Sequence, residues 1–159
     1  MNSTNNIDER MLKYLPWLGA MAIFMQALDG TILNTSLPTI ALELGKSPLE
    51  MQSIIVAYTL TVALLITLSG WLSDKYGTKK VFQSAILIFT LGSVFCAFAT
   101  TLPALVISRI VQAVGGSMMV PVVRLAILYA YPKKELLKVI NFITIPGLIG
   151  PLLGPSLGG

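Results

Sequence analysis

Two charged side chains lie inside otherwise apolar stretches of the sequence, Asp29 in the first stretch and Arg109 in the fourth. Placing an ionisable group near the centre of a bilayer costs roughly 2.5 to 3.5 kcal/mol on insertion scales, so such groups usually line a pathway or relay protons. The chain contains no histidine, which removes Ser-His and Cys-His nucleophilic pairs and histidine-based zinc sites. The single cysteine, Cys96, lies in the third stretch, where a thiol behaves as a small hydrophobe, so neither a disulfide nor a metal site is expected. The residues therefore predict transport chemistry and argue against an enzyme.

Polar residues accompany both charges at helical spacing. Gln112 follows Arg109 by three positions, so the two side chains share one helix face. In the first stretch, four residues fall within about 140° of the helix circumference at about 100° per residue. They are Gln26, Asp29, Gly30 and Asn34. A polar stripe of this width predicts a wall that faces water.

The two charges should lie at nearly the same depth in the membrane. Asp29 lies 8 residues from the outer end of its stretch and Arg109 lies 7 residues from the outer end of its own, at a rise of about 1.5 Å per residue. We hypothesise that both face one polar cavity, in which Arg109 modulates proton binding by Asp29. The alternative is a static buried ion pair that stabilises the helix bundle.

The elements that must position these side chains are long and apolar. Hydrophobic residues make up 55% of the chain, charged residues make up 11%, and the mean hydropathy is +0.80. Stretches that approach or exceed the roughly 20 residues of a spanning helix cover residues 15–37, 51–72, 81–100, 102–129 and 139–157. The sequence therefore predicts an all-α integral membrane protein with five transmembrane helices, preceded by a tail over residues 1–14.

Basic residues give the orientation of these spans. Of the 11 Lys and Arg residues, eight lie on one side of the predicted membrane, one on the other, and two inside the fourth stretch, Arg109 and Arg124. The eight are Arg10, Lys13, Lys75, Lys79, Lys80, Lys133, Lys134 and Lys138, against Lys46 alone. The positive-inside rule places the amino terminus and the tail in the cytoplasm. The net charge of +4 reflects this topology, so no nucleic-acid partner is expected.

The segment after the second stretch carries a motif. Residues 70–80 read Gly-x-Leu-x-Asp-Lys-x-Gly-x-Lys-Lys. The pattern resembles the signature loop of the major facilitator superfamily, in which glycine permits a tight turn and the aspartate belongs to a cytoplasmic gate. The resemblance implies a gate loop of Gly70, Asp74, Lys75, Gly77, Lys79 and Lys80, although Thr78 stands where the family more often has a basic residue. The alternative is a basic loop that acts only as an orientation signal.

Two further motifs lie on the charged stretches. Residues 109–116 read Arg-Ile-Val-Gln-Ala-Val-Gly-Gly, which is similar to the Arg-x-x-Gln-Gly-x-Gly pattern of the superfamily, with Ala113 where glycine is usual. Residues 28–38 read Leu-Asp-Gly-Thr-Ile-Leu-Asn-Thr-Ser-Leu-Pro and resemble the first-span motif of its fourteen-span drug:proton antiporters. This second match is the most specific to a subfamily in the chain.

Small residues and prolines recur in the last stretch. Gly150, Gly154 and Gly158 are each four apart, which predicts one stripe for close helix contact. Pro151 and Pro155 each remove a backbone donor, so a bent helix is expected. The pattern resembles the fifth-span antiporter motif, thought in the family to seal against leak, and implies the set Gly147, Gly150, Pro151, Gly154, Pro155, Gly158 and Gly159. Simple small-residue packing is the alternative.

Together the resemblances imply the amino-terminal portion of a major facilitator protein, whose halves each contain six helices. They imply a secondary active transporter that exports amphipathic drugs or other small molecules across the inner (plasma) membrane, with protons, a small-molecule substrate and the lipid bilayer as partners. No phosphate-binding loop of the ATPase type is present, so no cofactor is expected and the proton gradient supplies the energy. The remaining helices of the parent transporter are expected partners. Two alternatives stay open: a solute importer of the same superfamily, and a membrane remnant or accessory subunit that transports nothing.

Overall fold

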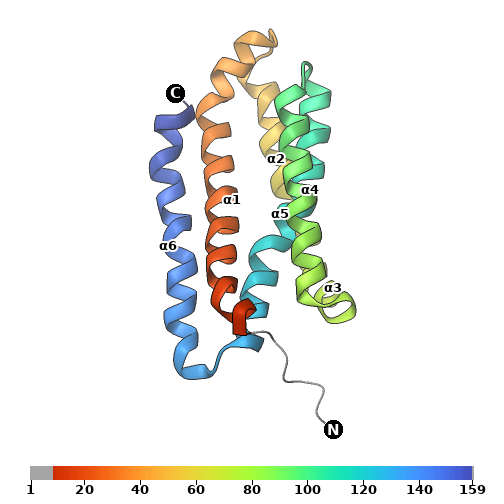
Figure 1. Ribbon diagram of the computed structural model, residues 1–159. Coiled ribbons are helices and arrows are strands. Elements are labelled where there is room, and N and C mark those ends of the chain that lie inside the picture. The colour runs from red at the N-terminus through yellow and green to blue at the C-terminus, as the bar shows by residue number, and fades with distance from the viewer. Residues whose placement is uncertain (1–8, 159) are drawn as a thin grey trace.

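The chain folds into a bundle of helices that run alternately up and down (Figure 1). The computed structural model describes residues 9–158, and the six helices found in that range are α1 (Glu9–Glu43), α2 (Pro48–Leu65), α3 (Leu68–Tyr76), α4 (Thr78–Phe98), α5 (Leu102–Ala130) and α6 (Lys133–Gly158). No strand occurs among these described residues. The all-α prediction is therefore confirmed. Of the predicted tail over residues 1–14, residues 9–14 form the start of α1, and the rest lies outside the described range.

Side-chain caps set where two of the helices begin. Ser47 accepts a hydrogen bond from the backbone N–H of Glu50, while the Glu50 carboxylate accepts one from the Ser47 backbone N–H at 2.9 Å. This reciprocal capping box satisfies two amides that have no partner inside the helix. Thr101 caps α5 in a similar way, because its hydroxyl accepts from the backbone N–H of Ala104. Proline in the first turn of both helices suits these starts, since an amide is not needed there.

The second apolar stretch is broken, which corrects the prediction of one span over residues 51–72. Helix α2 ends at Leu65 and α3 begins at Leu68, with a turn between them. Hydroxyl groups at the break bond backbone carbonyls of the preceding turn: Thr67 donates to Leu64 at 3.3 Å and Ser69 donates to Ile66 at 2.6 Å. Such side chains compete with the helical backbone ladder. Mean hydropathy does not reveal this competition, because apolar residues outnumber the two hydroxyl-bearing residues around the break.

The predicted gate loop over residues 70–80 is also corrected. Its first seven residues belong to α3 and its last three begin α4, so Gly77 alone separates the two helices. Gly77 has φ +85°, a backbone conformation that side chains other than glycine rarely adopt. The segment is therefore a corner between two helices and not an extended loop.

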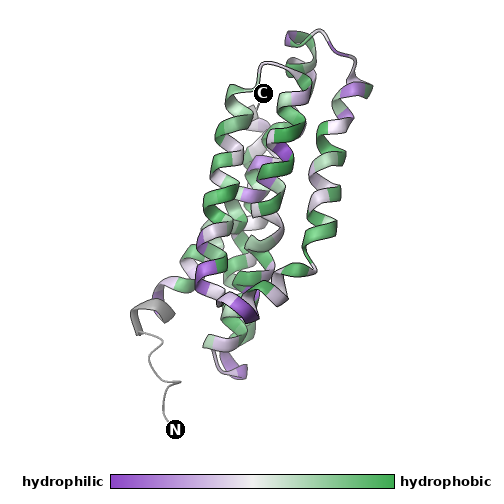
Figure 2. Cartoon of the chain, turned by 90° about the vertical axis from the view of Figure 1, so that its right-hand side faces the viewer, coloured by the Kyte–Doolittle hydropathy of each residue, from purple (hydrophilic) through white to green (hydrophobic). Residues whose placement is uncertain are grey.

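Four of the described helices are long and apolar enough to cross a membrane, namely α2, α4, α5 and α6. Five such helices were predicted. The first, α1, is long enough but less apolar than the other four, because polar side chains such as Gln26 and Asp29 interrupt its apolar stretch. Figure 2 shows apolar residues over most of the length of the helices, with hydrophilic residues mainly toward the two ends of the bundle. Many large apolar side chains are exposed, for example Leu64 at 65% and Phe98 at 78%, as expected for helices that face lipid.

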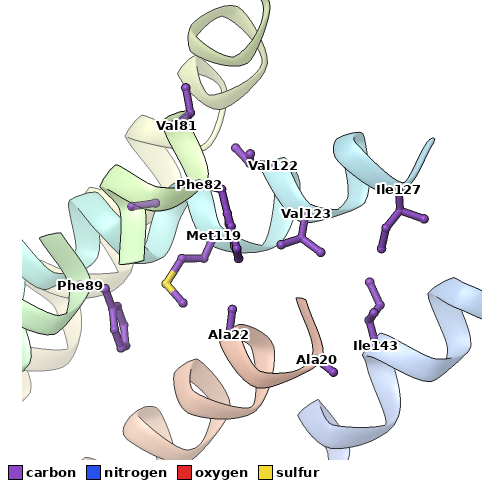
Figure 3. Packing of buried hydrophobic residues seen from close by; sticks show 11 residues of the cluster. Ala20, Ala22, Val81, Phe82, Phe89, Met119, Val122, Val123, Ile127 and Ile143 are labelled. Atoms are coloured by element: carbon purple, nitrogen blue, oxygen red, sulfur yellow. The ribbon is translucent and has the colours of Figure 1, made fainter. Parts of the chain in front are cut away.

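Helix α5 forms the centre of the packing and contacts every other described helix. A cluster of buried apolar side chains joins α1, α4, α5 and α6 (Figure 3). It contains Ala20, Ala22, Val81, Phe82, Ala85, Phe89, Met119, Val122, Val123, Ile127 and Ile143. Glycine permits a close approach of α4 to α5 beyond this cluster: a Cβ atom at Gly92 of α4 would lie 2.5 Å from the backbone nitrogen of Gln112 on α5.

The substitution Gly92→Ala should destabilise the bundle by about 1 to 3 kcal/mol, because the added methyl group overlaps backbone atoms that cannot move independently. The thermal unfolding midpoint of the full-length gene product in detergent measures this loss. Gly30→Ala is the matched control, since a Cβ there meets nothing within 4 Å and alanine favours a helix by up to about 1 kcal/mol. Equal midpoints for the two variants would contradict the close packing of α4 on α5.

Candidate functional site

The two charges that the sequence singled out form an ion pair. Asp29 lies near the middle of α1 and Arg109 lies on α5, and Arg109 Nη1 donates to Asp29 Oδ2 at 2.7 Å. The side chain of Arg109 is 4% exposed and that of Asp29 is 21% exposed. The contact confirms the prediction that both residues lie at one depth. Because the carboxylate is partly exposed, it can be reached from outside the helix bundle.

Gln112 joins the pair from the next turn of α5. Its Nε2 donates to Asp29 Oδ1 at 2.8 Å, and its Oε1 accepts from Arg109 Nη1 at 2.6 Å. Each carboxylate oxygen therefore has one donor, and the amide is completely buried. The thiol of Cys96 on α4 lies 3.8 Å from Gln112 Oε1. These contacts define the charge cluster, which consists of Asp29, Arg109 and Gln112.

Tyr58 on α2 also contacts Arg109, and it was not among the residues predicted from the sequence. Its ring centroid lies 4.4 Å from Arg109 Cζ, within the range of a cation–π contact. Gln26 on α1 links this tyrosine to α5, because Gln26 Nε2 donates to Tyr58 Oη at 3.3 Å and to the Gly116 carbonyl at 3.2 Å. A tyrosine near the middle of an otherwise apolar stretch was the available signal, since its hydroxyl needs a partner at that depth.

The polar stripe predicted on α1 divides in the structure. Gln26 and Asp29 point toward α2 and α5 and make the contacts described above. Asn34 is exposed and takes no part in the charge cluster. A Cβ atom at Gly30 would meet nothing within 4 Å, so open space lies beside it. Of the stripe, Asp29 therefore belongs to the charge cluster and Gln26 to the contact with Tyr58, whereas Gly30 and Asn34 take part in neither.

A small cavity of about 230 Å³ opens beside the ion pair, between α1, α4 and α5. Asp29, Arg109, Ser36 and Cys96 supply its polar atoms, and apolar side chains complete the lining. Among residues 9–158, no three His, Cys, Asp or Glu side chains gather as metal ligands would. The arrangement offers a carboxylate that can bind and release a proton next to a permanent cation.

The residues of the predicted gate lie away from the charge cluster, at the α3–α4 corner. Asp74 is exposed and has no ion-pair partner within the described part of the chain. Lys75 Nζ lies 4.7 Å from the Trp71 ring centroid and 5.3 Å from that of Tyr76. Gly70 lies within α3, and Lys79 and Lys80 are exposed in the first turn of α4.

The glycine stripe of α6 packs against α1 around Asp29. A Cβ atom at Gly150 would lie 2.8 Å from Ala27 Cβ and 3.1 Å from the backbone nitrogen of Leu28, and one at Gly154 would overlap Thr31. Gly147 makes a similar approach to Ile23. Helix α6 continues through Pro146, Pro151 and Pro155 to Gly158, while Gly159 lies outside the described residues. Helix α6 thus contacts the turn of α1 that carries the carboxylate.

The substitution Gln112→Leu should lower stability by about 1 to 3 kcal/mol, because it leaves Arg109 and Asp29 each without one hydrogen-bond partner in a buried position. The thermal unfolding midpoint in detergent reports the loss. Gln83→Leu is the matched control, because Gln83 is exposed on α4. If both variants melt like the wild type, Gln112 does not bridge the pair.

The substitution Gly77→Ala should cost about 1 to 3 kcal/mol, since alanine is strained at φ +85°. Gly70→Ala changes the same motif at a helical position where a Cβ meets nothing within 4 Å, and should be neutral or stabilising. Protease cleavage at the α3–α4 corner of the folded protein distinguishes the two: faster cleavage is expected for Gly77→Ala alone. Equal cleavage would contradict the corner geometry.

Comparison with known proteins gives the family. Residues 19–159 match the family model of the Major Facilitator Superfamily. Similar relatives carry the provisional name multidrug resistance protein MdtD: the chain is 52% identical to that of Citrobacter koseri, 53% to that of Serratia proteamaculans and 54% to that of Yersinia enterocolitica. Each match covers 90% of this chain and 30% of the relative, so the chain spans about 30% of the length of these proteins. The chain therefore belongs to the major facilitator superfamily, as a multi-pass membrane protein of a transporter family and not as an enzyme.

Proposed function

We propose that the protein containing this chain is a proton-driven exporter of amphipathic drugs or similar small molecules across the inner (plasma) membrane. The observation that carries the proposal is the carboxylate of Asp29, which lies at mid-bundle in contact with a buried cation. The name of the relatives, multidrug resistance protein, supports drugs as the transported molecules. The proton gradient supplies the energy in this proposal, and no cofactor takes part.

Asp29 takes up and releases the coupled proton. In its ionised form it accepts from Arg109 and Gln112, so both oxygens are held. Protonation removes its charge and one acceptor site, and the attraction to Arg109 falls accordingly. The pair then loosens, and groups on α1 and α5 become free to move apart. A substrate that competes for the carboxylate shifts the same balance, which couples cargo to protons.

The remaining predicted residues have supporting roles in this scheme. Asp74 and the lysines of the α3–α4 corner gate the cytoplasmic side, with partners in the part of the transporter outside this chain. Helix α6 seals the bundle along α1, because Gly150 and Gly154 bring it into close contact with α1 on both sides of Asp29 along the chain. Alternating access requires two halves that rock around a site at the midplane. Since the chain spans about 30% of its relatives, the complete pathway includes helices beyond those described.

The substitution Asp29→Asn should abolish proton-coupled export, because asparagine nearly keeps the shape of the side chain and one of its two acceptor oxygens but does not bind a proton at physiological pH. Substrate-driven proton movement in vesicles containing the full-length gene product measures the coupling directly. Glu43→Gln is the matched control, an exposed acid at the end of the same helix. Export that persists in Asp29→Asn would remove Asp29 from the mechanism, and uptake in place of export would favour a solute importer.

A further inference from the structure

Tyr58 touches Arg109 at a place that the ion pair does not use. Arg109 Nη1 donates to both Asp29 and Gln112. Arg109 Cζ lies over the face of the Tyr58 ring, 4.4 Å from the ring centroid. A cation is attracted to the face of an aromatic ring by the electron density there, and the attraction grows when water is excluded. Arg109 therefore has two kinds of partner, one charged and one aromatic, on different helices.

The ring is held in this position by its hydroxyl group. Gln26 Nε2 donates to Tyr58 Oη at 3.3 Å and also to the Gly116 carbonyl at 3.2 Å. Gly116 leaves the room that the hydroxyl needs, since a Cβ atom there would lie 2.6 Å from Tyr58 Oη. Helices α1, α2 and α5 thus meet at one tyrosine. The ring cannot leave Arg109 without breaking these contacts.

The two partners of Arg109 differ in how they respond to a proton. An arginine keeps its charge throughout the physiological range of pH. When Asp29 binds a proton, Arg109 loses its counter-charge while it stays 4% exposed, and its Nε already lacks a hydrogen-bond partner. A buried cation without compensation is strongly unfavourable. A neutral carboxylate no longer draws the guanidinium toward α1, so the attraction between Arg109 and the Tyr58 ring is stronger when Asp29 is protonated than when it is ionised.

We infer that Tyr58 is a positioning residue that holds the Arg109 guanidinium while Asp29 is protonated. The inference rests on the proposed function, in which Asp29 carries the coupled proton. Without the electron-rich ring face, Arg109 would keep the Asp29 carboxylate and the neutral Gln112 amide as partners, and only the ionised carboxylate would compensate its charge. The ionised state of Asp29 would then be favoured, and a higher proton concentration would be needed to load the site.

The other titratable groups near Asp29 are few. Arg109 faces it from α5, Tyr58 lies across the guanidinium on α2, and Cys96 approaches through Gln112 from α4. The charged residues of α3 and α6 lie in the last turns of α3 and the first turns of α6, at positions 74, 75, 133, 134, 135 and 138. A change in the ring at position 58 therefore acts on Asp29 through Arg109.

Fluorinated phenylalanines at position 58 test this role without removing the side chain. Each added fluorine draws electron density from the ring face while the shape is nearly kept, and Phe provides the baseline without the hydroxyl. Export by the full-length gene product in vesicles is measured while the pH on the proton-uptake side is varied. The pH at which export falls to half should move lower with each fluorine, by about one unit in total, a tenfold change in proton concentration. The same series at Tyr14, which is 57% exposed on α1, should leave this pH unchanged.

The outcomes separate this inference from the proposed function. A half-maximal pH that stays constant across the fluorinated series, while Asp29→Asn abolishes export, overturns the role of the ring and leaves the proposed function intact. A full shift in Tyr58→Phe with no further change on fluorination assigns the effect to the hydroxyl and also overturns it. Export that survives Asp29→Asn rejects the proposed function itself. A graded shift at position 58 together with none at Tyr14 supports the inference.

Discussion

A buried guanidinium is the constraint on which the arrangement of the helices depends. Arg109 is 4% exposed, and an uncompensated charge at that position would cost several kcal/mol. Compensation comes from three helices: α1 supplies the Asp29 carboxylate, α2 supplies the Tyr58 ring, and α5 supplies the Gln112 amide. Because each of these contacts is short-ranged, they hold α1, α2 and α5 close together around one group.

Close approach of the backbones is what makes such a cluster possible. Gly92 lets α4 lie directly against the backbone at Gln112, and Gly116 makes room for the hydroxyl of Tyr58. Around this polar centre many leucine and phenylalanine side chains are exposed on the surface of the bundle. This arrangement suits a bilayer, because lipid contacts the apolar surface while the charged side chains pair with one another inside the bundle.

Asp29 lies on the helix that connects the two packed sides of the bundle. One face of α1 meets α5 through the ion pair, and another meets α6 through Gly150 and Gly154. Any change in the charge of Asp29 therefore acts on a helix that packs against α5 on one face and α6 on another. The break between α2 and α3 separates the helix that carries Tyr58 from the α3–α4 corner.

The sequence by itself determined the helical class, the depth of Asp29 and Arg109, and the place of Gln112 beside them, because hydropathy and helical spacing are local properties of the chain. It did not determine the break after Leu65, which depends on hydroxyl groups that bond the backbone. It also did not reveal Tyr58, because a residue without charge in an apolar stretch acquires meaning only from its neighbours on other helices. The pairing of partners across α1, α2 and α5 was decided by the tertiary structure, since lateral packing brings together residues that are 32 to 90 positions apart in the chain.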